Sequence, residues 1–501
     1  MTRSADQHVV IVGAGFSGIA MGIELSREGV PFTILDRASD LGGVWHHNTY
    51  PGAACDIPSA LYSFSYAPRG DWSHPCSPHD EIKGYLRECA ERFGLVPHLR
   101  LGVEVADATF DEATARWTVT TEAGEELEAS AVVLACGQLS RPAWPRIPGI
   151  DRFAGHSFHS AEWDHDHDLT GERIAVIGTG ASAVQFVPPV AERAGRLHVF
   201  QRSPSYMLPR RNRPYAAWAR TAIDKVPGLQ RVRRGGIYAF CETLTFGLPS
   251  APPIAAGLEA FTLGFLRRSV KDPELRAKLT PDYAIGCKRI LFSSKFYPAL
   301  QRPNVELVTD GIREITEHGI VTDDGQEREV DTIVFGTGFK SQQFVLPMTV
   351  RGAGGRELQE GWQAGAEAHH GMTVSGFPNL FVLYGPNTNL SVGSIVVMIE
   401  AQAAYVRRAL GHVRSRGVDA IDVRPEVQQA SNTGLQKDFE GSVWTGCSSW
   451  YRNASGRVVS NWPHRMREYQ RLVADVRAEE FREVRATGAP EREREPAGVA
   501  D

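Results

Sequence analysis

The stretch VVIVGAGFSG, residues 9–18, decides how this chain begins to fold. Its four β-branched residues show no polar alternation, which predicts a strand buried on both faces of a parallel sheet. Glycines then allow a tight turn, a helical segment follows at 19–28, and a second strand at 32–35 ends on Asp36. This order predicts a dinucleotide-binding unit, because the turn and the helix N-terminus present free N–H groups to a pyrophosphate.

The same pattern returns at IAVIGTGASA, residues 174–183, followed by a helical segment at 184–194 and a strand at 197–200. The two units differ in the residue after their second strand. Asp36 offers a carboxylate to ribose hydroxyls, whereas Arg202 offers a guanidinium that suits a 2'-phosphate. The sequence therefore predicts FAD in the first unit and NADPH in the second, and hence an oxidoreductase.

Between the units, residues 101–134 alternate apolar and polar side chains around a turn at 123–125, which predicts an antiparallel meander. Residues 208–287 have helical spacing with few turn signals. We expect an α/β fold with two Rossmann-like dinucleotide-binding domains and a helical insertion in the second. The predicted FAD domain comprises residues 1–145 and 341–501, and the predicted NADP domain comprises residues 146–340.

The composition of the 501 residues is that of a soluble globular protein, with 42% hydrophobic residues and a net charge of -5. This charge predicts neither a nucleic-acid partner nor an anionic membrane. No apolar run approaches the roughly 20 residues of a membrane span, so we expect no stable membrane insertion. The seven cysteines include no CxxC pair, which argues against a disulfide framework, against a metal site and for a cytoplasmic location.

Two longer motifs carry a family resemblance. Residues 42–56 read GGVWHHNTYPGAACD, and residues 153–164 read FAGHSFHSAEWD, which matches the fingerprint FxGxxxHxxxW followed by Pro or Asp. With GCKR at 286–289 and GPNT at 385–388, the chain resembles class B flavoprotein monooxygenases of the Baeyer–Villiger type from about residue 8 to residue 470. It departs from that family at Asp36, where a glutamate is more common.

The resemblance implies that NADPH reduces FAD and that the reduced flavin captures O2 as a C4a-peroxyflavin. That species would attack a small hydrophobic ketone and give an ester or lactone. The resemblance assigns Arg289 as the fixed cation beside the flavin and Asp56 as the carboxylate that orients it. It also implies that Lys288 contacts the 2'-phosphate with Arg202, that Trp450 closes over the nicotinamide ribose, and that the fingerprint lies on the linker between domains.

The predicted cofactor contacts are more numerous than the catalytic pair. For FAD they are Gly13, Gly15, Ser17, Gly18, Asp36, Val44, Trp45, Asp56, Tyr62, Val105 and Asn387. For NADP they are Gly178, Thr179, Gly180, Ala181, Ser182, Ala183, Arg202, Ser203, Lys288 and Trp450.

Several alternatives stay open at the level of sequence. A flavin-containing N- or S-monooxygenase would share both nucleotide units, and so would a nucleotide-binding redox sensor that no longer oxygenates. The apolar insertion could line a substrate tunnel or face a membrane. The ketone, the regiochemistry and the oligomeric state are not encoded in any of these motifs.

Overall fold

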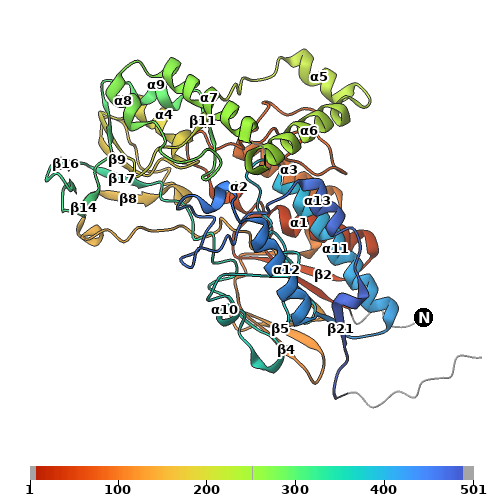
Figure 1. Ribbon diagram of the computed structural model, residues 1–501. Coiled ribbons are helices and arrows are strands. Elements are labelled where there is room, and N and C mark those ends of the chain that lie inside the picture. Colours follow the sequence, from red (N-terminus) through yellow and green to blue (C-terminus); the bar gives the residue numbers. More distant parts are fainter. Residues whose placement is uncertain (1–6, 251, 489–501) are drawn as a thin grey trace, which may run out of the picture.

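The computed structural model describes residues 7–250 and 252–488. A parallel five-stranded sheet forms the centre of the first nucleotide unit (Figure 1). The strands follow the order β19 (Leu380–Val382), β7 (Ala131–Leu134), β1 (Val9–Val12), β2 (Phe32–Asp36) and β3 (Leu99–Leu101). Helices α1 (Phe16–Glu28) and α11 (Ile395–Arg416) pack against each other beside this sheet. Segments from both ends of the sequence therefore build the first nucleotide unit.

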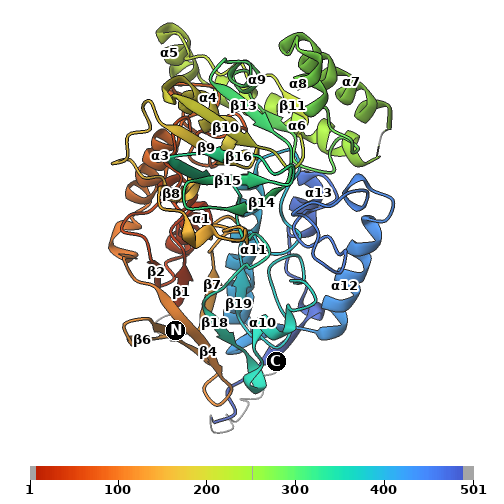
Figure 2. The same cartoon turned by 90° about the vertical axis from the view of Figure 1, so that its left-hand side faces the viewer.

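A second parallel five-stranded sheet forms the other nucleotide unit and lies above the first in Figure 2. Its order is β13 (Val305–Val308), β10 (Arg196–Phe200), β9 (Arg173–Ile177), β17 (Thr332–Phe335) and β8 (His156–His159). Helices α4 (Ala183–Arg193) and α9 (Phe296–Leu300) pack together in this unit. The α/β fold class with two Rossmann-like units is thus confirmed.

The fingerprint at 153–164 occupies a defined place in this second unit. Residues 156–159 form the edge strand β8, which pairs in parallel with β17, so this stretch is part of the sheet rather than a free linker. Gly155 has no room for a side chain, because a Cβ there would lie 2.4 Å from the carbonyl oxygen of Asp331. His159 is buried, and burial lowers its pKa to about 4. At neutral pH it is uncharged.

Smaller sheets complete the two units. The expected meander is present as β4 (Val105–Asp111), β5 (Arg116–Thr121) and β6 (Glu126–Ala129), with β18 (Thr349–Arg351) beside β4. The second unit carries the antiparallel strands β14 (Ile312–Ile315), β15 (Gly319–Thr322) and β16 (Glu327–Glu329). Near the C-terminus, β20 (Ala420–Val423) pairs with β21 (Phe481–Val484). Outside the helical insertion, the other α-helices are α2 (Val44–His47), α3 (His79–Arg92), α10 (Leu358–Gly361), α12 (Pro425–Asp438) and α13 (Met466–Leu472).

The expected helical insertion lies between the short paired strands β11 (Met207–Leu208) and β12 (Leu291–Phe292). It contains α5 (Ala217–Lys225), α6 (Leu229–Ser250), α7 (Pro252–Ser269) and α8 (Pro273–Lys278), which lie at the top of Figure 2. Leu258 and Leu263 pack against a buried cluster of Tyr206, Ile285 and Ile290, so α7 covers the chain on both sides of Arg289. Among the described residues, none of the helices could cross a membrane.

The two segments that connect the units lie against each other. The N–H of Ala143 donates to the carbonyl of Gly338 at 2.8 Å, and the Thr337 hydroxyl donates to the carbonyl of Ala143 at 2.6 Å. Pro142 and Phe339 form an isolated antiparallel bridge. The two segments that connect the nucleotide units are therefore hydrogen-bonded to each other where the chain passes between the units. The division of the chain at residues 145 and 340 stays a prediction, and residues 1–6 and 489–501 of the predicted first domain lie outside the described residues.

Candidate active site and cofactor cradles

The first glycine turn forms a cradle that has no room for larger residues. Gly13 has φ 113°, and a Cβ there would lie 2.5 Å from the carbonyl oxygen of Ala135 at the end of β7. A Cβ on Gly18 would lie 1.8 Å from the carbonyl oxygen of Gly13. Helix α1 begins after Gly15 without a side-chain cap, so its first N–H groups stay available to an anion. This geometry fits the pyrophosphate of a dinucleotide.

The second glycine turn repeats that geometry. Gly178 has φ 111°, and a Cβ there would lie 2.4 Å from the carbonyl oxygen of Gly336, just after β17. Ser182 at the start of α4 makes no side-chain cap, and the neighbouring Thr179, Gly180 and Ala181 retain solvent exposure. Ala183 is buried at the position of the third glycine. The N-terminus of α4 therefore also fits a pyrophosphate.

The carboxylate of Asp36 lies at the edge of the first cradle. Its Oδ2 accepts from the N–H of Ala14 at 2.6 Å, and its Oδ1 accepts from the N–H of Ala38 at 2.8 Å. Asp36 thus braces the glycine turn from the end of β2. Its contact with a ribose hydroxyl stays a prediction.

Aromatic side chains surround the start of α1. The ring of Tyr62 lies edge-on to Phe16 at 5.1 Å and to Trp45 at 5.6 Å. The indole of Trp45 acts on the Tyr62 hydroxyl through a side-chain hydrogen bond. Contacts of Trp45 and Tyr62 with FAD stay predictions. Ser17 is buried within the first turn of α1, and Val44 begins α2.

Two residues predicted to contact FAD have structural roles. The amide nitrogen of Asn387 donates to the carbonyls of Val458 and Asn461, at 2.7 and 3.0 Å, and so ties the 385–388 turn to a later segment. Val105 is buried in the hydrophobic core beside Leu35. Contacts of either residue with FAD stay predictions.

Arg202 and Lys288, both predicted to recognise the 2'-phosphate, lie near Ser203, which is another predicted NADP contact. Lys288 Nζ donates to Ser203 Oγ at 2.9 Å, and the adjacent Arg202 is exposed. Burial, and then the positive charge of Arg202, lower the pKa of Lys288. Two cations that repel each other at one surface provide a site for an anion.

The predicted catalytic pair forms directly. Arg289 Nη2 donates to Asp56 Oδ2 at 2.7 Å, and the side chains are 30% and 21% exposed. The charge of Asp56 raises the pKa of Arg289 against the opposing effect of burial. Burial alone would raise the pKa of Asp56, but Arg289 and then Arg210 more than offset it and lower that pKa. Both groups therefore stay ionised across the physiological pH range.

The motifs did not reveal Arg210 or Tyr451 as neighbours of this pair. Arg210 Nη2 donates to the carbonyl of Cys55 at 2.5 Å, and its charge acts on Asp56. Tyr451 is fully buried, and its phenol acts electrostatically on Arg289. The only sign of Tyr451 in the sequence was its position directly after Trp450. The guanidinium therefore lies among polar groups from three separate segments of the chain.

Gln185 of α4 joins the two nucleotide units. Its Oε1 accepts from the hydroxyl of Tyr50 at 3.1 Å and from the N–H of Ala54 at 3.2 Å, and its Nε2 donates to the carbonyl of Ala54 at 3.0 Å. The ring of Phe186 lies between Tyr50 and Trp163, with centroid distances of 5.8 and 5.3 Å. The fingerprint tryptophan is thereby connected to the YPG motif through the helix that begins at the NADP cradle.

The cysteines require a correction. Cys287 and Cys447 form a disulfide with their Cα atoms 6.1 Å apart, although the absence of a CxxC pair argued against such bonds. The two residues are 160 positions apart, so local spacing could not reveal the pair. Cys287 directly precedes Lys288, and Cys447 lies three residues before Trp450. The disulfide thus ties the predicted 2'-phosphate site to the loop that carries Trp450.

We expect Cys447→Ser to loosen this loop and to raise the KM for NADPH several-fold, with little change in FAD content. Loss of the disulfide should also lower the free energy of unfolding by about 2–4 kcal/mol. Steady-state kinetics and thermal unfolding measure both effects, with Cys136→Ser as the control. Under denaturing, non-reducing conditions the wild type should present five thiols, because the other two of its seven cysteines are paired. Titration of seven thiols would contradict the disulfide.

Comparisons with known proteins agree with this geometry. The model of the family described as flavin-binding monooxygenase-like matches residues 6–219. The chain is 43% identical to a Baeyer-Villiger monooxygenase of Pseudomonas aeruginosa, over 92% of this chain and 89% of that protein. It is also 43% identical to a Baeyer-Villiger monooxygenase of Streptomyces coelicolor, over 96% of this chain and 93% of that protein.

Solved structures give the same relationship. An oxidized steroid monooxygenase bound to NADP is 33% identical and superposes with a TM-score of 0.85, over 95% of this chain and 99% of that one. A closed structure of cyclohexanone monooxygenase is 28% identical, with a TM-score of 0.85 and the same coverage. The similarity extends over nearly the whole chain. The chain belongs to the Baeyer-Villiger monooxygenase family.

Proposed function

We propose that this protein is an FAD- and NADPH-dependent monooxygenase that inserts one oxygen atom beside a ketone carbonyl and forms an ester or lactone. The observation that carries this proposal is the ion pair of Arg289 with Asp56, set beside two cradles that each fit a dinucleotide. When bound, FAD takes electrons from NADPH and supplies the activated oxygen.

Arg289 supplies a fixed positive charge to this site. An activated oxygen stays nucleophilic only while it stays negatively charged, and an arginine does not give up its proton at neutral pH. Asp56 holds the guanidinium by a charge-assisted hydrogen bond and keeps it in one place. Because the cation is already positioned, no reorganisation is needed as negative charge develops. Asp56 is therefore a positioning residue.

We infer that the insertion keeps the site dry and receives a small hydrophobic ketone. Tyr206, Ile285 and Ile290 form a buried cluster next to Arg289, and apolar residues of α7 cover it. Exclusion of water strengthens the electrostatic contacts inside and favours an apolar substrate. This packing supports the tunnel-wall alternative over a membrane-facing surface, although Phe240 and Phe261 on the same helices are exposed.

The function is tested with purified protein, NADPH, O2 and a panel of cyclic, linear and aryl ketones. Mass spectrometry should detect esters or lactones one oxygen heavier than the ketones. Amines and thioethers form a second panel, because an N- or S-monooxygenase would oxidise these and give no ester. Consumption of NADPH and O2 without any ester would overturn the proposal.

We expect Arg202→Ala to raise the KM for NADPH about tenfold to a hundredfold while that for NADH changes little, because a charged hydrogen bond contributes about 1.5–3 kcal/mol. Steady-state kinetics with both nucleotides measures the difference. Arg193→Ala, at the far end of α4, is the control and should affect neither nucleotide. An equal rise for NADPH and NADH would remove the 2'-phosphate role from Arg202.

We also propose a cytoplasmic location, which the five unpaired cysteines support and the Cys287–Cys447 disulfide opposes. Fractionation of cells that express the protein should place it in the soluble cytoplasmic fraction. Recovery with the membranes would argue instead for a membrane-facing insertion.

A further inference from the structure

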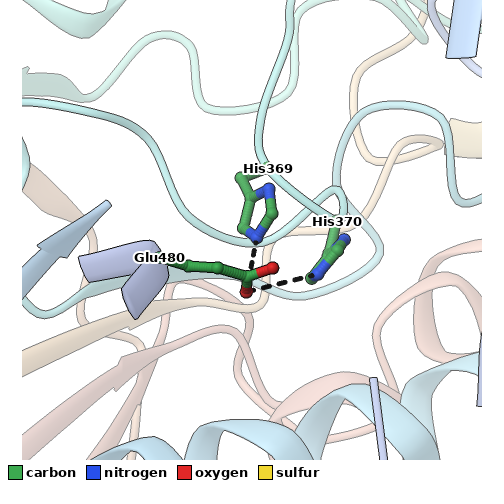
Figure 3. A group of neighbouring side chains, drawn as sticks. All are labelled: His369, His370 and Glu480. Carbon is green, nitrogen blue, oxygen red and sulfur yellow. Dashed lines mark hydrogen bonds and ion pairs between the residues drawn. The ribbon is translucent and has the colours of Figure 1, made fainter. Parts of the chain in front are cut away.

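A buried cluster of two histidines and one glutamate lies apart from the residues assigned to the cofactors. His369 and His370 are consecutive residues of the loop between α10 and β19, and Glu480 ends the short helix η6 (Ala478–Glu480). Figure 3 shows both rings directed at one carboxylate. His369 Nε2 lies 3.2 Å from Glu480 Oε2, and His370 Nε2 lies 3.9 Å from the same oxygen.

These separations fit a single metal ion. A tetrahedral zinc ion with bonds of about 2.0–2.1 Å keeps its ligand atoms about 3.3 Å apart. The three ligand atoms of this cluster all lie within 4.8 Å of one another. Small shifts of the His370 side chain therefore suffice to bring the three atoms to the spacing of a metal site.

Hydrogen bonding satisfies the cluster only in part, because His369 Nε2 forms a hydrogen bond with Glu480 Oε2 whereas His370 Nε2 lies too far from that oxygen to do so. The side chains of His369, His370 and Glu480 are only 3%, 7% and 11% exposed. The Nδ1 atoms of both histidines are buried without a hydrogen-bond partner. Two rings whose centroids lie 3.7 Å apart compete for one carboxylate oxygen. Two rings that share one carboxylate oxygen are incompletely satisfied by it, and an ion held between their Nε2 atoms and Glu480 is one explanation for such a network.

Neighbouring residues hold the three side chains in place. Arg477 Nη1 donates to the other carboxylate oxygen of Glu480 at 3.1 Å, which leaves Oε2 to the histidines. His370 has φ 52°, and its carbonyl accepts from the hydroxyl of Tyr469 at 2.7 Å. The ring of Tyr405 lies edge-on to His370. Ligands that are fixed before binding lose little conformational entropy when a metal arrives.

The charges also suit a divalent cation. Imidazole nitrogens and a carboxylate oxygen are ligands that zinc accepts, and the carboxylate of Glu480 supplies a negative charge. The positive charge of Arg477, which contacts the other oxygen of Glu480, opposes a cation, but the Arg477 side chain is 52% exposed and solvent screens part of its charge.

The cluster is connected to the turn that follows β19. The hydroxyl of Tyr469 accepts from Gln402 Nε2 at 2.8 Å, and Gln402 Oε1 accepts from the N–H of Tyr384 at 2.9 Å. Tyr384 begins the turn that contains Gly385 and Asn387. Immobilising His370 would therefore stabilise this turn.

We propose that His369, His370 and Glu480 bind one divalent transition-metal ion of the zinc class. The ion braces the loop after α10 against the C-terminal strand β21. This site is independent of the oxygenation chemistry and would exist even if the proposed reaction were wrong.

The test uses the FAD-loaded full-length protein, stripped with a chelator and then dialysed against zinc chloride alone. Mass-spectrometric metal analysis should find one zinc per chain, and zinc should raise the Tm. His370→Gln should lose the bound zinc and the zinc-dependent part of the Tm, since mass action stabilises only the form that binds. Glu480→Gln, which keeps the size of the side chain, should behave likewise.

The control is His464→Gln. His464 is more exposed and lies near two carboxylates, 2.9 Å from Asp438 and 3.8 Å from Glu468, so it reports adventitious surface binding. It should bind zinc like the wild type. Visible flavin absorbance and circular dichroism establish that each variant is folded. Equal zinc content in the wild type and in folded His370→Gln and Glu480→Gln, or no bound zinc in the wild type, would overturn the proposal.

Discussion

Arg289→Ala should abolish ester formation while NADPH oxidation continues. The guanidinium is the positive charge beside the site, and alanine leaves Asp56 as an uncompensated negative charge in its place. Removal of one preorganised donor at comparable oxyanion sites lowers the rate by about 10²–10³-fold, and here the remaining carboxylate adds repulsion. Parallel assays of ester, NADPH and hydrogen peroxide measure the effect. Hydrogen peroxide should account for most of the NADPH consumed.

Two further variants separate charge from geometry at this position. Arg289→Lys keeps the charge but lacks the planar fork, so it should recover only part of the ester yield. Arg313→Ala removes an exposed arginine of the same unit and should behave like the wild type. Ester formation by Arg289→Ala within a few-fold of the wild type would show that another group supplies the cation. Arg210 would then be the first candidate, because it also acts on Asp56.

The sequence predicted best what is encoded over short distances. A β-branched run, a glycine turn and a helix must follow one another in the chain, so both cradles and the strands around them could be located by pattern. The resemblance then placed Arg289 opposite Asp56, two residues 233 positions apart that form a hydrogen bond in the structure. The resemblance also paired Lys288 with Arg202, and in the structure Lys288 forms a hydrogen bond with Ser203, the residue after Arg202.

What the sequence did not reveal are pairs that only the folded chain brings together. Cys287 and Cys447, or Gln185 and Ala54, have no spacing rule, since their contacts depend on how whole units pack. No motif linked the histidine pair at 369–370 to a site, because Glu480, the third residue of the cluster, lies 111 residues beyond His369. Asn387 has a role that its motif did not reveal, because its side-chain amide donates to the backbone carbonyls of another segment. Its contact with FAD stays a prediction. Periodicity and motifs report local conformation, whereas these contacts are set by packing.

Gly18→Ala should produce protein that binds FAD at least tenfold more weakly, a loss of about 1.4 kcal/mol or more. The added Cβ would lie 1.8 Å from the carbonyl oxygen of Gly13, and that atom belongs to backbone, which cannot rotate away. Helix α1 must therefore shift from the glycine turn, and the N–H groups that would hold the pyrophosphate shift with it. Visible absorbance of the purified protein and fluorescence titration with FAD measure the loss.

The matched control is Gly84→Ala, also within a helix but with no atom within 4 Å of the added Cβ. It should retain full FAD and gain up to about 1 kcal/mol in stability, because alanine favours a helix more than glycine does. Excess FAD should partly restore the yellow colour and the Tm of Gly18→Ala, which distinguishes weakened binding from misfolding. If Gly18→Ala instead purified with one FAD per chain, the close contact between α1 and its turn would not be required for the cradle. The pyrophosphate would then be held elsewhere. Any shift of α1 that relieves the contact between Gly18 and Gly13 also moves the helix N-terminus relative to the turn.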